Sequence, residues 1–130
     1  TTELLAAALL DMELHNLTDT DNLNVVAFEK ETMDKLGLIP EIAPRYRATY
    51  FSHIIGGYAA GYYSYLWAEV LDTDAFEAFK EHGVFDKNTA DSFRKNILEK
   101  GGTEDPMTLY RGFRGADPSL EPLLKNRGLK

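Results

Sequence analysis

The most informative stretch of this sequence is residues 53–65, which read His-Ile-Ile-Gly-Gly-Tyr-Ala-Ala-Gly-Tyr-Tyr-Ser-Tyr. A glycine pair separates a histidine from a segment that carries four tyrosines. Tyr58, Tyr62 and Tyr65 are spaced by four and then three positions, so a helix over 57–71 would place them on one face. The stretch therefore predicts a row of phenol hydroxyls that can line a channel and donate hydrogen bonds into it.

The rest of the chain predicts an all-α fold, a compact helical array with short connections. Alternation of apolar and polar residues is nearly absent, so we expect no sheet. Capping residues, prolines and glycines bound the other expected helices: 3–15, about 23–36, a continuation after Asp72 or Thr73 to Gly83, Asp86 or Asn88 to Gly101, Pro106 to Phe113, and Pro118 to Gly128. The candidate core residues are apolar and share helix faces: Leu5, Leu9, Met12, Val26, Met33, Leu36, Phe93, Ile97, Leu98, Leu120, Leu123 and Leu124.

Composition bounds the function. The 130 residues are 44% hydrophobic and 27% charged, as in an ordinary folded domain. Fourteen basic residues against twenty-one acidic ones give a net charge of -7, which disfavours binding to nucleic acid and to anionic lipid. No apolar run is long enough to span a membrane. Cysteine is absent, which excludes disulfides and thiolate metal sites and fits a reducing compartment, so we expect a cytoplasmic protein.

The tyrosine-rich stretch can be interpreted as ordinary packing or as a functional site. Helical phenols at this spacing are usually ordinary core or surface aromatics, and spacing alone favours that reading. Against it, four tyrosines within eight residues are dense for a core, because each buried hydroxyl needs a partner. Gly56 and Gly57 also permit positive φ or a loop that closes on a ligand. His53 lies beside this loop, where it could contact a substrate.

Other chemistry lacks support in the sequence. The His-Glu-x-x-His motif is absent and no two histidines lie at helical spacing, so we expect no metal bound by this chain. Ser52 and Ser64 lack a nucleophile elbow. Gly101-Gly102 precedes acidic residues and reads as a helix end, not as a phosphate loop. The arginines form no basic run and are expected in surface ion pairs or one carboxylate clamp: Arg45, Arg47, Arg111, Arg114 and Arg127.

The segment from Tyr46 to Trp67 is similar to the C-terminal catalytic region of the thimet-oligopeptidase-like zinc peptidases, the M3 metallopeptidases. The pattern Gly-Gly-Tyr-x-x-x-Tyr-Tyr-x-Tyr carries this resemblance, because glycines and several aromatics are fixed together. Leu10-Asp11-Met12 and Pro44-Arg45-Tyr46-Arg47 look most like the bacterial peptidyl-dipeptidase (Dcp) branch. Similar residues continue nearly to the end of the chain: Asp74-Ala75-Phe76, Gly83-Val84-Phe85, Phe93-Arg94, Ile97-Leu98, Gly101-Gly102, Pro106-Met107, Phe113-Arg114-Gly115, Pro118, Leu123-Leu124 and Gly128-Leu129.

The resemblance implies that residues 1–130 are the C-terminal helical region of an M3-type catalytic domain, without the portion that carries the zinc motif. The intact parent would be an all-α zinc metallopeptidase, and the Dcp likeness favours a peptidyl-dipeptidase that removes dipeptides from short peptides. Its partners would be peptide substrates and the remainder of the parent chain. Zinc would be held upstream in the parent, so we expect the isolated chain to be inactive.

The resemblance also implies roles for individual residues. Tyr65 would stabilise the tetrahedral oxyanion, and Tyr58 would contact the substrate backbone and assist in the same step. His53 would bond to a substrate carbonyl, and Tyr62 would shape the channel wall. The glycine pair 56–57 would let the loop close.

One departure and two alternatives stand beside this reading. Ala116 occupies a position where the family commonly has arginine, so a salt bridge there is not expected. The chain could instead be a non-catalytic helical module that binds a peptide or partner helix in an aromatic groove. It could also be a purely structural helical domain whose tyrosines are ordinary packing.

Overall fold

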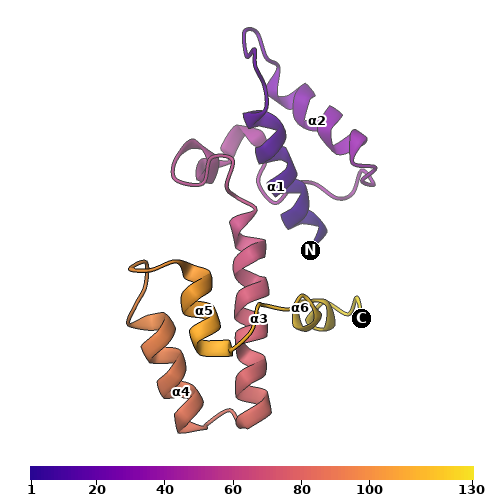
Figure 1. The fold of residues 1–130 in the computed structure, drawn as a ribbon. Coiled ribbons are helices and arrows are strands. Elements are labelled where there is room, and N and C mark those ends of the chain that lie inside the picture. Colours follow the sequence, from indigo (N-terminus) through magenta and orange to yellow (C-terminus); the bar gives the residue numbers. More distant parts are fainter. The chain divides into compact units, whose positions relative to one another are not determined.

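The computed structural model describes all of residues 1–130 and contains helices but no strand, which confirms the all-α prediction. The chain divides into two compact units, residues 1–66 and residues 67–130 (Figure 1). The boundary falls inside the long helix α3, Ser64–His82. No helix is both apolar enough and long enough to cross a membrane.

The first unit begins with two helices, α1 (Thr2–His15) and α2 (Val25–Lys35), which pack against each other (Figure 1). Both lie within two residues of the bounds expected from the sequence. The side chain of Asn24 accepts a hydrogen bond from the backbone N–H of Ala27 at 3.1 Å and so caps the start of α2. The cap is therefore Asn24, which the sequence analysis placed inside the helix and did not identify as a cap.

The predicted core face of α1 is wrong. Leu5, Leu9 and Met12 are exposed, and the helix buries a neighbouring face instead: Ala6, Ala7, Ala8, Leu10 and Asp11. Small side chains are buried because the aromatic rings of Phe51 and Tyr62 pack directly on Ala7 and Ala8. The bulk of this core therefore comes from rings supplied by a later segment of the chain, which the periodicity of α1 does not reveal.

The predicted core face of α2 is also wrong. Val26 and Leu36 are exposed, and Met33 is only half-buried. The helix buries Glu29 and Thr32 instead. A polar face turns inward here because Glu29 binds a later segment of the chain, as described below.

Two short 3-10 helices follow, η1 (Ala48–Tyr50) and η2 (Ser52–Ile55). The helix predicted to start near Gly57 is wrong at its beginning, because residues 56–63 form a series of turns and α3 starts only at Ser64. Ala60 has φ +53°, a left-handed conformation that interrupts a right-handed helix. We call residues 56–63 the glycine-tyrosine turn.

In the second unit α3 continues without a break to His82 (Figure 1). The predicted new helix start at Asp72 or Thr73 is therefore wrong. The Thr73 hydroxyl donates to the carbonyl of Glu69 at 2.6 Å, one turn earlier in the same helix, and so does not cap anything.

Three further helices complete the second unit: α4 (Lys87–Phe93), which runs into a π-helical turn η3 (Arg94–Leu98), then α5 (Pro106–Arg114) and α6 (Glu121–Asn126). Asp86 caps α4 by accepting from the N–H of Thr89 at 2.7 Å, as one predicted start requires. Pro106 occupies the first turn of α5, also as predicted. The last helix begins at Glu121, three residues later than expected from Pro118.

The core of the second unit combines small and aromatic residues. The rings of Phe79, Phe93 and Phe113 lie with centroids 5.1–6.3 Å apart. Of the predicted core residues here, Leu123 is buried, whereas Leu98 and Leu120 are exposed. Leu98 ends the π-helical turn, whose wider winding rotates side chains away from the positions that a regular helix would give them.

Candidate functional site

The predicted site residues all lie in the first unit, on three successive elements. His53 belongs to η2, Tyr58 and Tyr62 to the glycine-tyrosine turn, and Tyr65 to the first turn of α3. The four side chains nevertheless come together. The predicted helix face is therefore not what gathers them, since a folded turn does so.

The four rings form a continuous cluster. Tyr58 and Tyr65 stack with ring centroids 5.1 Å apart and an interplanar angle of 19°. Tyr62 meets Tyr65 at 5.1 Å and His53 at 5.3 Å, both edge to face. His53 also lies 5.9 Å from Tyr58 and 6.1 Å from Tyr65. Each ring thus supports at least two of the others, an arrangement that aromatic side chains favour energetically.

Exposure divides the tyrosines into two kinds. Tyr62 is only 3% exposed and belongs to the core cluster with Phe51, whereas Tyr58 and Tyr65 are 41% and 39% exposed. Burial is the main cause that raises the pKa of Tyr62 above its ordinary value. Tyr62 therefore forms the base of the cluster, and Tyr58 and Tyr65 present their phenols to the surface.

The Tyr65 phenol keeps its proton to a higher pH than an ordinary tyrosine does. The hydrogen bond with the Tyr58 side chain is the main cause that raises the pKa of Tyr65 above its ordinary value of 10.0, and neighbouring phenols act in the same direction. A protonated phenol is a reliable hydrogen-bond donor to a carbonyl or an oxyanion. One O–H of the pair lies in the bond between the two phenols, so the other can donate to a polar group placed against Tyr58 and Tyr65.

His53 has one ring nitrogen that the fold leaves unused. Its Nδ1 is buried and has no hydrogen-bond partner within the chain. The ring is held by aromatic contacts, with Tyr46 at 4.6 Å in addition to the tyrosines of the cluster. The position of His53 is thus fixed by packing and not by hydrogen bonding.

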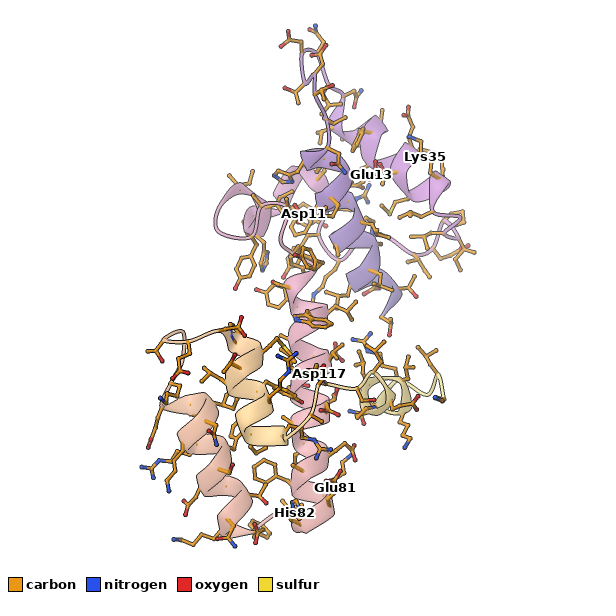
Figure 2. All side chains as sticks on the ribbon, in the orientation of Figure 1. Asp11, Glu13, Lys35, Glu81, His82 and Asp117 are labelled. Carbon is orange, nitrogen blue, oxygen red and sulfur yellow. The ribbon has the colours of Figure 1, made fainter.

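Asp11 of α1 holds the glycine-tyrosine turn. Its carboxylate accepts hydrogen bonds from the backbone N–H groups of Ala60 and Tyr62, both at 2.9 Å. Asp11 is labelled on α1 in Figure 2, and its side chain is fully buried. The Nδ1 of His15 lies 2.9 Å from the same carboxylate and 2.8 Å from the backbone carbonyl of Asp11. Sequence reasoning noted Asp11 only within the family resemblance. A carboxylate set among the apolar residues of 4–12 was the available signal.

Glu29 of α2 holds the segment that leads to His53. Its carboxylate accepts from the backbone N–H of Ala48 at 2.6 Å and pairs with the guanidinium of Arg47. Because charge-assisted bonds of this kind are strong, the two buried carboxylates, Glu29 and Asp11, fix the two ends of the site-bearing segment. Sequence reasoning missed Glu29 as well, because its partners lie 18 and 19 residues away.

The glycine pair 56–57 is open to larger side chains. A Cβ added at either position would meet no atom within 4 Å, and neither glycine has positive φ. The left-handed residue of the turn is Ala60 instead. Closure of this loop on a ligand stays a prediction.

The remaining sequence predictions concern charge and metal. Four arginines form ion pairs as expected: Arg47 with Glu29, Arg111 with Asp117, Arg114 with Glu81, and Arg127 with Glu69. Arg45 lies over the ring of Tyr46, 6.0 Å from its centroid. No three His, Cys, Asp or Glu side chains gather into a group that could hold a metal ion. The residues of this chain therefore do not fit a zinc site by themselves.

Comparison with known proteins identifies the class. An all-helical chain with surface phenols is compatible with many functions, but the family model described as Peptidase family M3 matches residues 1–129. The chain therefore belongs to peptidase family M3, which confirms the resemblance seen in the sequence.

Individual relatives agree with this assignment. The chain is 46% identical over 134 residues to the dipeptidyl carboxypeptidase of Escherichia coli, a match that covers 98% of this chain and 19% of that protein. It is 57% identical over 81 residues to oligopeptidase A of the same organism, covering 62% of this chain and 12% of that protein. A probable cytosolic oligopeptidase A of Arabidopsis thaliana is 42% identical over 94% of the chain and 18% of its own length. The matches thus span between 12% and 19% of the length of these relatives.

Proposed function

We propose that this chain is the C-terminal helical region of a zinc metallopeptidase, and that it supplies the hydrogen-bond-donor side of the active site. The intact protein would hydrolyse short peptides as a peptidyl-dipeptidase. The relative named dipeptidyl carboxypeptidase supports this specificity, because it matches 98% of the chain. The relative named oligopeptidase A matches a shorter segment at higher identity, so an oligopeptidase is the neighbouring possibility.

The observation that carries the proposal is the stacked, half-exposed pair of phenols, Tyr58 and Tyr65. Attack on a peptide carbonyl turns its oxygen into an oxyanion, and a donor already in place stabilises that charge more than it stabilises the substrate. Tyr65 donates its O–H to this oxyanion, and Tyr58 contacts the substrate backbone and assists. His53 bonds to a substrate carbonyl near the cut, and Tyr62 forms the wall behind them.

The metal belongs to the rest of the parent protein. M3 peptidases are metallopeptidases, and bound zinc would supply the activated water for hydrolysis. Since residues 1–130 gather no group of ligands, no hydrolytic step is assigned to a metal within this chain, and the isolated chain is expected to be inactive. The glycine pair 56–57 would let the site close on a peptide.

The proposed partners are a short peptide and the remainder of the parent chain. Ile55 and Phe85 are 85% and 98% exposed, and large apolar side chains left this open commonly mark surfaces that another part of a protein covers. Nucleic acid and anionic membranes are disfavoured by the net charge of -7. A cytoplasmic location is proposed from the absence of cysteine and from the plant relative described as cytosolic.

The test is to replace Tyr65 with Phe in the full-length protein. Tyr65→Phe removes one donor and leaves the ring stacking, so kcat on a short peptide should fall by about 10²–10³-fold. Tyr63→Phe is the matched control, because Tyr63 is exposed, lies two positions away and takes no part in the ring cluster. Its kcat should stay near that of the unmodified protein.

Equal turnover in Tyr65→Phe and Tyr63→Phe would contradict the oxyanion role. A full-length protein that binds peptides but never cleaves them would instead support the non-catalytic aromatic groove.

A further inference from the structure

The glycine-tyrosine turn is held from outside by a single side chain. Asp11 on α1 lies 49 and 51 positions before its two amide partners, Ala60 and Tyr62, and each of its carboxylate oxygens accepts one of these N–H groups at 2.9 Å. The side chain is fully buried, so water does not compete for these bonds. A carboxylate that grips two alternate amides fixes both the position and the direction of the backbone between them.

The backbone at Ala60 is in a conformation that is unfavourable without the contact to Asp11. Ala60 has φ +53°, where a residue with a Cβ is strained. The bond from the Ala60 N–H to Asp11 offsets this strain in the folded protein. Without Asp11 the turn would relax toward a right-handed conformation, which would move the residues on both sides of Ala60.

Tyr62 transmits this effect to the site. Its N–H is the second group held by Asp11, and its ring lies 5.3 Å from His53 and 5.1 Å from Tyr65. Tyr65 in turn stacks on Tyr58. A shift of the backbone at residue 62 therefore displaces each ring of the cluster.

Asp11 is itself well supported. His15 lies one turn later on the same helix and places its Nδ1 2.9 Å from the carboxylate. The carboxylate thus has two backbone N–H donors and the His15 ring beside it, and these contacts offset part of the cost of removing it from water. These contacts hold the Asp11 carboxylate in one orientation.

We propose that Asp11 is a positioning residue for peptide hydrolysis: it fixes the strained turn at Ala60 and thereby sets the placement of the Tyr58 and Tyr65 phenols. This inference rests on the proposed function for its catalytic part. Its structural part concerns the turn alone and can be measured without any reaction.

The experiment compares Asp11→Asn with Asp74→Asn in the full-length protein. Asn matches the shape of Asp but can accept from only one of the two amides, and it turns an NH₂ group toward the other. Asp74 is a matched control because it is also a buried carboxylate with a side-chain donor, the Tyr110 hydroxyl at 2.5 Å, and it belongs to the second unit. The two readouts are amide hydrogen exchange of the peptide covering 56–63, and kcat and KM on a short peptide.

We expect Asp11→Asn to raise exchange in 56–63 by about tenfold or more, because the bonded amides open more often. We expect kcat to fall by roughly 10- to 100-fold with little change in KM, because misplaced donors weaken transition-state stabilisation more than substrate binding. Asp74→Asn should leave both readouts near their original values.

A second comparison, made in the Ala60→Gly variant, distinguishes loss of the anchor from general loss of folding. Gly adopts φ +53° without strain, so in the Ala60→Gly background the turn should depend less on its anchor. Asp11→Asn should then raise exchange in 56–63 by a clearly smaller factor than it does when Ala60 is present. An equal or larger factor in the Ala60→Gly background would contradict the anchoring of a strained residue.

The outcomes separate this inference from the function it builds on. Unchanged exchange in 56–63 overturns the role of Asp11 whatever the activity does. Suppose that Tyr65→Phe lowers turnover, and that Asp11→Asn raises exchange in 56–63 but leaves kcat unchanged. That combination overturns the positioning role of Asp11. If Tyr65→Phe leaves turnover intact, the proposed oxyanion donor fails, and the exchange data still decide whether Asp11 holds the turn.

Discussion

At the scale of single residues, the proposed role of Tyr65 depends on its phenol being protonated. Tyr65 acts as a donor only while it carries its proton, and its hydrogen bond with Tyr58 is the main cause of its raised pKa. The donor form therefore persists through pH 10.0, the ordinary value, and is lost only above it. Under the proposed function, this bond would extend to higher pH the range over which Tyr65 can donate.

This gives a prediction for alkaline pH. In the full-length protein, Tyr58→Phe removes the hydrogen bond and should lower the pKa of Tyr65, so the alkaline fall in kcat should move to lower pH. The pH profile of kcat, together with ultraviolet absorbance of tyrosinate, measures the shift. An alkaline limb that does not move would show that Tyr58 does not control the Tyr65 proton.

A second residue-scale prediction concerns Tyr110, whose hydroxyl donates to the buried Asp74 carboxylate at 2.5 Å. Tyr110→Phe removes a donor from a buried charge and should lower the free energy of unfolding by about 1–3 kcal/mol. Denaturant unfolding measures this loss, and Tyr63→Phe is the control, since Tyr63 is exposed.

The pH dependence of that stability has a definite sign. Burial is the main cause that raises the pKa of Tyr110 in the folded state above its ordinary value of 10.0. Protonated Tyr110 therefore makes its full contribution to the free energy of unfolding below pH 10.0. This contribution is lost as the pH rises toward the raised pKa of Tyr110 in the folded state. Stability should thus fall more steeply above pH 10.0 in the original protein than in Tyr110→Phe. Parallel curves would contradict the assignment.

At the scale of elements, local signals predicted helices well where a cap or a proline sits beside them. Asp86 and Pro106 mark the starts of α4 and α5, and Gly115, with φ +76°, ends α5. The start of α3 could not be found this way. The left-handed Ala60 that delays it is held by Asp11 on another element, and pairing between residues so distant in sequence leaves no periodic pattern.

The same reasoning explains what could be predicted of the site. The proximity of His53 and the three tyrosines could be anticipated from their closeness in the sequence, and their rings do cluster, whereas their functional roles stay a prediction. The geometry could not be anticipated, since the phenols meet across a turn and Tyr62 is buried beneath them. The anchoring role of Glu29 could not be predicted, because Glu29 looks like an ordinary helix carboxylate until its distant amide partner is known. Asp11 stands out among apolar residues, but its partners, 49 and 51 positions later, could not be predicted either.

The element-scale prediction concerns the start of α4. Asp86→Ala removes the side chain that accepts from the Thr89 N–H and should lower the free energy of unfolding by about 1 kcal/mol. The hydrogen bond from Thr89 is also the main cause that lowers the pKa of Asp86, so its contribution is present above the ordinary value of 3.8 and is lost as the pH falls below it.

Asp91→Ala is the control for this cap. Asp91 lies in the same helix with only a loose, exposed ion pair to Lys87 at 3.6 Å, so its loss should change the unfolding free energy by less than about 0.5 kcal/mol. Denaturant unfolding at neutral and at acid pH measures both variants. Equal losses in the two would contradict the capping role.

At the scale of the whole molecule, the chain is two compact helical units that belong to peptidase family M3. The first unit carries the aromatic cluster and both of its carboxylate anchors. Because the chain spans 19% of the E. coli dipeptidyl carboxypeptidase that it resembles, its proposed chemistry can only be measured in the full-length protein.

The most direct measurement uses a phosphinic peptide, whose tetrahedral oxygens imitate the transition state of peptide hydrolysis. If Tyr65 donates to the oxyanion, Tyr65→Phe should weaken binding of this inhibitor by the same factor by which it lowers kcat/KM, about 10²–10³-fold, and should leave affinity for the product peptide unchanged. Inhibitor and product affinities that fall by equal factors, or an inhibitor affinity that does not fall at all, would contradict the role assigned to Tyr65.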